Sequence, residues 1–268
     1  MSRRNFLRLV PTVSATGLFS SGLLSACAPN TPGLVTQAPH ADPTTRRKIR
    51  AICFDLFTLF DPRSVVETAR RFAGDKAPEL CEAWRTRQFE YSWLRVAAKK
   101  YADFEVVTEE ALRFAAKARS VTLSDDARHT LVEAYSQLSP WPDARDALEA
   151  WKHAGIVLAP LSNYSPPMLE RLLATAGLSD FFSTQISTDS ARTFKPDPAA
   201  YALGESRLGL TRQEIAFAAF GGWDAAGAKW FGFPTFWVNR LGVPKEELIE
   251  PDGTGATLAG LADFVRSW

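Results

Sequence analysis

Ile49-Arg50-Ala51-Ile52-Cys53-Phe54-Asp55 is a short run of β-forming apolar residues that ends at a carboxylate. Its length and composition predict a buried strand over 49–54. Open parallel sheets bind ligands beyond the carboxyl ends of their strands, which is where Asp55 falls. Asp55 is therefore a candidate nucleophile or metal ligand. The alternative is a loop aspartate that caps the next segment.

Strand and helix patterns alternate after Pro140. We expect strands over 156–161, 185–187, 215–220 and 235–238, and helices over 143–153, 167–176, 198–208, 224–231 and 258–268. Such alternation is typical of a parallel sheet covered by helices on both faces. The predicted fold class is therefore α/β, with a Rossmann-like parallel sheet core.

Residues 62–139 interrupt this alternation with a helical pattern. Thr108 and Ser124 are candidate N-caps, because acidic residues follow each of them closely. An all-helical insert directly after the first strand would lie over the carboxyl ends of the sheet. We therefore predict a core domain from 49–61 and 140–268, a helical cap domain over 62–139, and a ligand cleft between them.

The beginning of the chain carries signals of export rather than of a fold. Arg3-Arg4 with Phe6-Leu7 resembles the twin-arginine signature, and an apolar run over 9–26 follows it. Leu24-Ser25-Ala26-Cys27 resembles the lipobox, in which the cysteine is lipidated. We expect an export signal over 1–27, a flexible tether over 28–48 and a periplasmic protein with a lipid anchor at Cys27. A chance apolar leader with an ordinary cysteine is the alternative.

The composition limits the classes of partner. The chain has 268 residues and a net charge of +1, which does not suggest a nucleic-acid binder. Its three histidines have no metal-ligand spacing relative to Cys or Glu, and its three cysteines are too few and scattered for a disulfide framework. No glycine-rich phosphate loop or Gly-x-Ser-x-Gly elbow occurs. We therefore expect neither a metal nor another cofactor.

Four short motifs resemble those of the haloacid dehalogenase superfamily. They are Phe54-Asp55-Leu56-Phe57-Thr58-Leu59-Phe60-Asp61, Leu161-Ser162-Asn163, Phe194-Lys195-Pro196 and Trp223-Asp224. The stretch from Trp84 to Arg95, followed by Tyr101-Ala102-Asp103-Phe104, is more specific. It is similar to the cap of the type II, or L-2-haloacid, dehalogenases. Tyr201, in Lys195-Pro196-x-Pro198-x-x-Tyr201, also matches that branch.

The resemblance implies a reaction and a set of roles. Asp55 would displace halide from C2 of a 2-haloalkanoic acid, and hydrolysis of the resulting ester would give a 2-hydroxy acid. Lys195 would hold Asp55, Thr58 would contact it, and Asp224 would orient or activate the water. The implied catalytic residues are Asp55, Thr58, Arg85, Lys195 and Asp224, and the implied substrate-binding residues are Ser162, Asn163, Phe57, Phe89, Phe104, Tyr201 and Trp223. The implied partner is a small 2-haloacid, and a homodimer is expected from the resemblance alone.

Two observations on individual residues bear on this chemistry. Arg85 shares one side of a predicted helix with Phe89, Ser92 and Trp93, so it needs an anionic partner. That partner is a halide or substrate carboxylate, or alternatively a core carboxylate in a structural ion pair. Phe57 stands where phosphatases of the superfamily generally carry a second aspartate. A halide leaving group needs no proton, so this loss favours dehalogenation over phosphoryl transfer.

The sequence also departs from the family at two places. The glycine usual after the nucleophile is missing, and Asp61 lies six residues beyond Asp55 instead of seven. Gly221 and Ala219 replace polar residues usual before Asp224. The alternatives are therefore a hydrolase of the same superfamily on another small carboxylate or phosphate, or a non-catalytic anion-binding protein.

Overall fold

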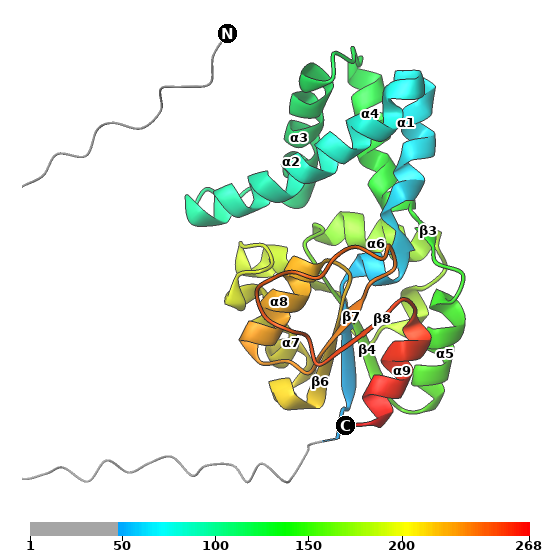
Figure 1. Ribbon diagram of the computed structural model, residues 1–268, viewed down its shortest axis with the longest axis vertical. Coiled ribbons are helices and arrows are strands. Elements are labelled where there is room, and N and C mark those ends of the chain that lie inside the picture. The colour runs from blue at the N-terminus through cyan, green and yellow to red at the C-terminus, as the bar shows by residue number, and fades with distance from the viewer. Residues whose placement is uncertain (1–47) are drawn as a thin grey trace, which may run out of the picture. The chain divides into compact units, whose positions relative to one another are not determined.

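The computed structural model describes residues 48–268, in which a parallel sheet lies beneath a bundle of helices (Figure 1). The export signal and Cys27, as well as most of the predicted tether, lie outside the described residues. The sheet order is β5-β4-β1-β6-β7-β8. The strands are β1 (Ala51–Phe54), β4 (Val157–Ser162), β5 (Ile186–Ser187), β6 (Ile215–Ala219), β7 (Thr235–Val238) and β8 (Gly253–Gly255), and all pairings are parallel.

The central strand β1 is buried because helices cover both faces of the sheet. Ile52 and Phe54 share a core with α5 (Ala144–His153) and α9 (Leu258–Arg266), and the Phe54 ring lies 5.5 Å from that of Trp151. Ala51 and Cys53 pack on the opposite face, which α7 (Pro198–Leu208) and α8 (Gly222–Phe231) cover. The alternating directions of strand side chains produce these two cores. The predicted fold class is confirmed.

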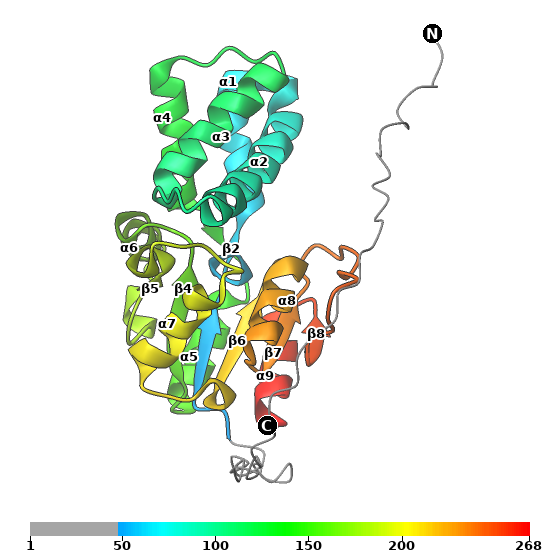
Figure 2. The same cartoon turned by 90° about the vertical axis from the view of Figure 1, so that its left-hand side faces the viewer.

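Four helices between β1 and β4 form the bundle beyond the carboxyl ends of the strands (Figure 2). They are α1 (Val65–Ala73), α2 (Ala77–Ala97), α3 (Phe104–Ala118) and α4 (Asp125–Ala134). The Ser124 hydroxyl caps α4 as expected, by accepting the Ala127 N–H at 3.1 Å. The expectation that a helix starts at Thr108 was wrong. Asp103 caps α3 five residues before Thr108, and Thr108 is buried inside the helix.

Three short strands were not predicted. The chain enters the bundle through β2 (Phe60–Asp61) and returns through β3 (Ser139–Pro140), and these two strands pair antiparallel. They form the hinge between the sheet and the bundle. Edge strand β8 has the sequence Gly-Thr-Gly, which carries no strand signal. Glycine is required there because a Cβ at Gly253 would come within 2.8 Å of the Phe236 ring.

The remaining helix, α6 (Pro166–Thr175), follows β4 and buries Met168, Leu169, Leu172 and Leu173. None of the helices within 48–268 combines the length and apolarity that a bilayer-spanning segment needs.

Candidate active site

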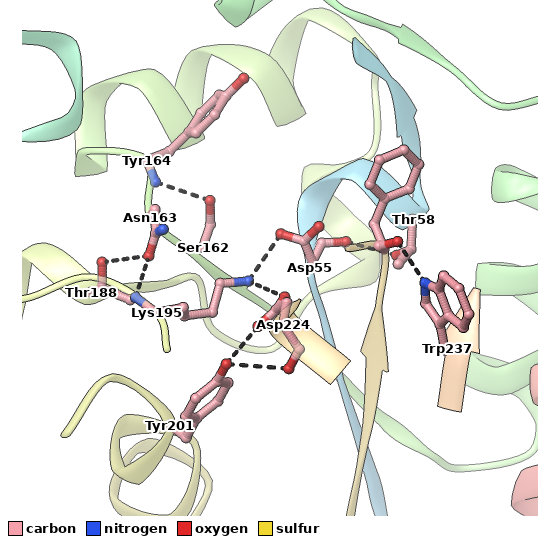
Figure 3. A network of polar contacts seen from close by, with 11 residues as sticks. Asp55, Thr58, Ser162, Asn163, Tyr164, Thr188, Lys195, Tyr201, Asp224 and Trp237 are labelled. Atoms are coloured by element: carbon pink, nitrogen blue, oxygen red, sulfur yellow. Dashed lines mark hydrogen bonds and ion pairs between the residues drawn. The ribbon is translucent and has the colours of Figure 1, made fainter. Parts of the chain in front are cut away.

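The sheet brings four polar side chains to its carboxyl edge (Figure 3). Asp55 directly follows β1, Ser162 ends β4, and Asp224 lies in the first turn of α8, which follows β6. Lys195 extends toward them from the segment between β5 and α7. Residues far apart in the sequence therefore meet at one point, as expected for parallel strands.

Lys195 lies between two carboxylates. Its Nζ is 2.9 Å from Asp55 Oδ1 and 2.8 Å from Asp224 Oδ2, and its side chain is only 1% exposed. Burial lowers the pKa of Lys195, but Asp224 and Asp55 outweigh burial, so that its pKa is raised and the ammonium stays charged. Asp55 Oδ2 accepts no hydrogen bond from residues 48–268, and this oxygen is free to react.

Asp224 is fully buried and does not line the cavity beside Asp55. Its Oδ1 accepts a hydrogen bond from the Tyr201 hydroxyl at 2.7 Å. Burial raises the pKa of Asp224 to about 6, and the negative Asp55 adds to the rise, whereas Lys195 and Tyr201 oppose it. Both carboxylate oxygens of Asp224 are thus held in place.

The resemblance implies that Tyr201 binds the substrate, but in the structure Tyr201 does not line the cavity. It is completely buried behind Asp224, away from the cavity. Gly227 makes this position available, since a Cβ there would lie 2.5 Å from the Tyr201 hydroxyl oxygen. Tyr201 is therefore placed to position Asp224.

Ser162 and Asn163 line the cavity and offer unused donors to it. The Ser162 Oγ accepts the Tyr164 N–H at 3.0 Å, and Asn163 Oδ1 accepts the Lys195 N–H at 2.9 Å. Within residues 48–268, neither the Ser162 hydroxyl proton nor the Asn163 amide nitrogen has an acceptor. Asn163 thus fixes the Lys195 segment while keeping donors for an anion.

Arg85 lies on α2, above the sheet, and lines the same cavity. Its guanidinium carbon is 5.5 Å, 5.7 Å and 5.3 Å from the ring centroids of Phe57, Phe89 and Phe220. In the described part of the chain, no acid forms an ion pair with Arg85. The alternative of a structural ion pair with a core carboxylate was therefore wrong. Burial lowers the pKa of Arg85, and Tyr135 and Asp55 partly oppose this. A charged guanidinium among aromatic rings is suited to hold a small anion.

Aromatic rings close the cavity around Asp55. Phe57, Phe89, Phe104 and Trp223 all line it, as the resemblance implied, and Phe104 also stacks on Tyr164 with ring centroids 5.3 Å apart. The cavity leaves about 20 Å³ of free space, room for about one water molecule. A 2-haloacid is larger than this space, so side chains or elements of the cavity wall must shift to admit one.

Thr58 contacts Asp55 through the main chain rather than through the carboxylate. Its hydroxyl donates to the Asp55 carbonyl oxygen at 2.7 Å, and the side chain is buried outside the cavity. The sequence reading missed Tyr164 and Phe220, which both line the cavity. Both residues lie just beyond β4 and β6, at the carboxyl edge of the sheet, and that position is the signal that could have identified them.

Potential metal ligands are not clustered in this site. Within residues 48–268, no group of three His, Cys, Asp or Glu side chains is arranged to hold a metal ion. Phe57 occupies the position two residues after Asp55, with its ring in the cavity wall.

Comparisons with known proteins agree with this arrangement. The family model of haloacid dehalogenase-like hydrolases matches residues 49–232. An (S)-2-haloacid dehalogenase from Pseudomonas sp. (strain YL) is 41% identical, over 82% of this chain and 95% of that protein. Haloacetate dehalogenase H-2 from Moraxella sp. (strain B) is 38% identical, over 82% of this chain and 99% of that protein.

Solved structures include the L-2-haloacid dehalogenase from Xanthobacter autotrophicus with chloropropionic acid covalently bound. It is 36% identical, covers 81% of this chain and 98% of that one, and has a TM-score of 0.77. The protein therefore belongs to the haloacid dehalogenase-like hydrolases, in the family of the (S)-2-haloacid dehalogenases.

Proposed function

We propose that this protein hydrolyses (S)-2-haloalkanoic acids to 2-hydroxy acids through an ester formed on Asp55. The observation that carries the proposal is a carboxylate with one free oxygen, held by a buried lysine, at the floor of an aromatic cavity. Arg85, which has no acid partner within residues 48–268, adds a cation for the departing halide. We propose the (S) enantiomer as the substrate because the similar proteins are (S)-2-haloacid dehalogenases.

In the first step, Asp55 Oδ2 attacks C2 and the carbon–halogen bond breaks with its electron pair leaving on the halide. Attack from the side opposite the halogen inverts the carbon. Ser162 and Asn163 supply donors for the substrate carboxylate, and Arg85 receives the halide. The aromatic wall leaves little room for water, which strengthens these charge interactions.

In the second step, water attacks the ester carbonyl carbon of Asp55. The hydroxy acid leaves with the oxygen that came from Asp55, and the water supplies the oxygen that restores the carboxylate. One proton is released for each halide. We propose that Asp224 orients this water and takes its proton, for which its Oδ2 must exchange the contact with Lys195 for the water.

Halide release from the two enantiomers of 2-chloropropionate tests the proposal. We expect release from the (S) form in the presence of a chelator and at least tenfold slower release from the (R) form. The product is expected to be (R)-lactate, because one inversion occurs. A folded protein that releases halide from neither enantiomer would contradict the proposal. Saturable binding of 2-chloropropionate without turnover would then favour the non-catalytic anion-binding alternative.

The Tyr201→Phe variant is expected to change the pH dependence of kcat. Asp224 accepts a proton only as a carboxylate, so kcat falls as the pH drops through the pKa of about 6. The Tyr201 hydroxyl lowers that pKa, and its loss raises it. The acid limb of the kcat profile should therefore move to higher pH in Tyr201→Phe.

Tyr91→Phe is the matched control, because Tyr91 packs against Phe114 in the bundle, far from the Asp224 hydrogen bonds. Identical acid limbs in the two variants would show that Tyr201 does not act on Asp224.

We also propose that the protein is exported and lipidated at Cys27. Support comes from the sequence alone, namely Arg3-Arg4 and the lipobox-like Leu24-Ser25-Ala26-Cys27. Mass spectrometry of the mature N-terminus tests this, and an unmodified chain that begins before Cys27 would contradict it. The homodimer stays a prediction from the resemblance, for which light scattering in solution is the test.

A further inference from the structure

We propose that Arg240 and Trp141 are positioning residues that hold the turn carrying Asp55 in its reactive place. The inference rests on the proposed function for its kinetic consequences. The turn runs from Asp55 to Leu59 and includes the short helix η1 (Leu56–Thr58). It contains no glycine, and three of its main-chain carbonyls accept hydrogen bonds from Trp141 and Arg240.

Arg240 and Trp141 bind most of the carbonyl groups of this turn. The Trp141 indole donates to the Phe57 carbonyl at 3.0 Å, and the Trp141 N–H donates to the Leu59 carbonyl at 2.9 Å. Arg240 donates to the Thr58 carbonyl from Nη2 at 2.8 Å and from Nε at 3.3 Å. The two remaining carbonyls accept from within the turn: that of Asp55 binds the Thr58 N–H and hydroxyl, and that of Leu56 binds the Leu59 N–H.

Arg240 is itself anchored in the core. Its side chain is 5% exposed, and its Nη1 donates to Asp143 Oδ2 at 2.9 Å. The same carboxylate oxygen accepts the Leu258 N–H at 3.0 Å, at the start of α9. Arg240 thus connects the turn to two helices beneath the sheet edge.

Trp141 connects the same turn to the hinge. It directly follows β3, and the guanidiniums of Arg240 and Arg63 lie 5.1 Å and 5.2 Å from its ring centroid. Arg63 lies just after β2, on the bundle side of the hinge. Arg240 therefore anchors the turn on the side of the sheet, and Trp141 fixes it to the start of the chain that returns from the bundle.

The test compares Arg240→Lys and Trp141→Phe with Arg63→Gln. The first two changes remove donors to the turn, whereas Arg63→Gln removes a guanidinium from the same indole ring without touching a carbonyl of the turn. We expect a 10- to 100-fold fall in kcat and in the single-turnover rate of Asp55 alkylation for the first two variants, with KM changed less than threefold. For Arg63→Gln we expect both rates within about threefold of the wild type.

Hydrogen exchange provides a readout that does not depend on activity. The amides of Thr58 and Leu59 should exchange at least tenfold faster in Arg240→Lys and Trp141→Phe than in Arg63→Gln. Equal kcat losses in all three variants at equal Tm, or a loss confined to KM, would overturn the inference. If the wild type releases no halide, the proposed function fails, and unchanged exchange at Thr58 and Leu59 would then overturn the positioning role as well.

Discussion

The Asp55→Asn variant is expected to release halide from (S)-2-chloropropionate at least about 10⁴-fold more slowly than the wild type. The amide oxygen carries no negative charge, so it cannot displace halide at a useful rate. The residual cavity, with Arg85, Ser162 and Asn163 unchanged, should still bind the substrate anion. Halide release by initial rates, and the mass of the protein quenched during turnover, are the measurements. Only the wild type should gain the mass of the propionate ester.

Asp61→Asn is the matched control for this substitution. Asp61 is a carboxylate six residues further along, whose side chain pairs with Arg63 at the hinge and does not line the cavity. Its loss should leave halide release within about threefold of the wild type. Halide release by Asp55→Asn at more than a hundredth of the wild-type rate would show that another group attacks the substrate.

The Lys195→Met variant is expected to lose both stability and activity. Without the Lys195 ammonium, Asp55 and Asp224 lose the cation that both contact. Breaking a buried ion pair in this way lowers the free energy of unfolding by about 3–5 kcal/mol. Activity should fall by at least about 10³-fold, because Asp55 loses the cation that holds its carboxylate in place. Urea unfolding and halide release are the measurements.

The double variant Lys195→Met with Asp224→Asn separates these two effects. Removing one of the two uncompensated charges should recover at least half of the lost unfolding free energy, whereas activity should stay as low as in Lys195→Met. A double variant no more stable than Lys195→Met would show that the cost comes from packing rather than from charge.

The sequence predicted the parallel sheet well because its strands are short apolar runs that end at polar residues. It could not predict β8, since two of the three residues of that strand are glycines selected by contact with Phe236. Similarly, β2 and β3 have two residues each, and their pairing depends on the hinge that the inserted helices create. The local sequence pattern reveals neither the contact of β8 with Phe236 nor the pairing of β2 with β3.

The site was predicted as a set of residues but not as an arrangement. Asp55 and Lys195 meet as expected. Tyr201 instead binds Asp224, and Thr58 binds the main-chain carbonyl of Asp55. Their positions depend on tertiary contacts, such as the room that Gly227 leaves for the Tyr201 hydroxyl. The contact of Arg240 with the turn also left no sequence signal, because its partner there is the main-chain carbonyl of Thr58.

The order of the strands has a consequence for the behaviour of the protein at high concentration. Both edges of the sheet are its shortest strands, β5 with two residues and β8 with three. Unpaired N–H and C=O groups on an edge strand can recruit a strand from another molecule, and a short edge offers few of them. The more apolar strands β1, β4 and β6 lie inside the sheet, where both of their sides are already paired. The folded sheet therefore presents little template for edge-to-edge aggregation.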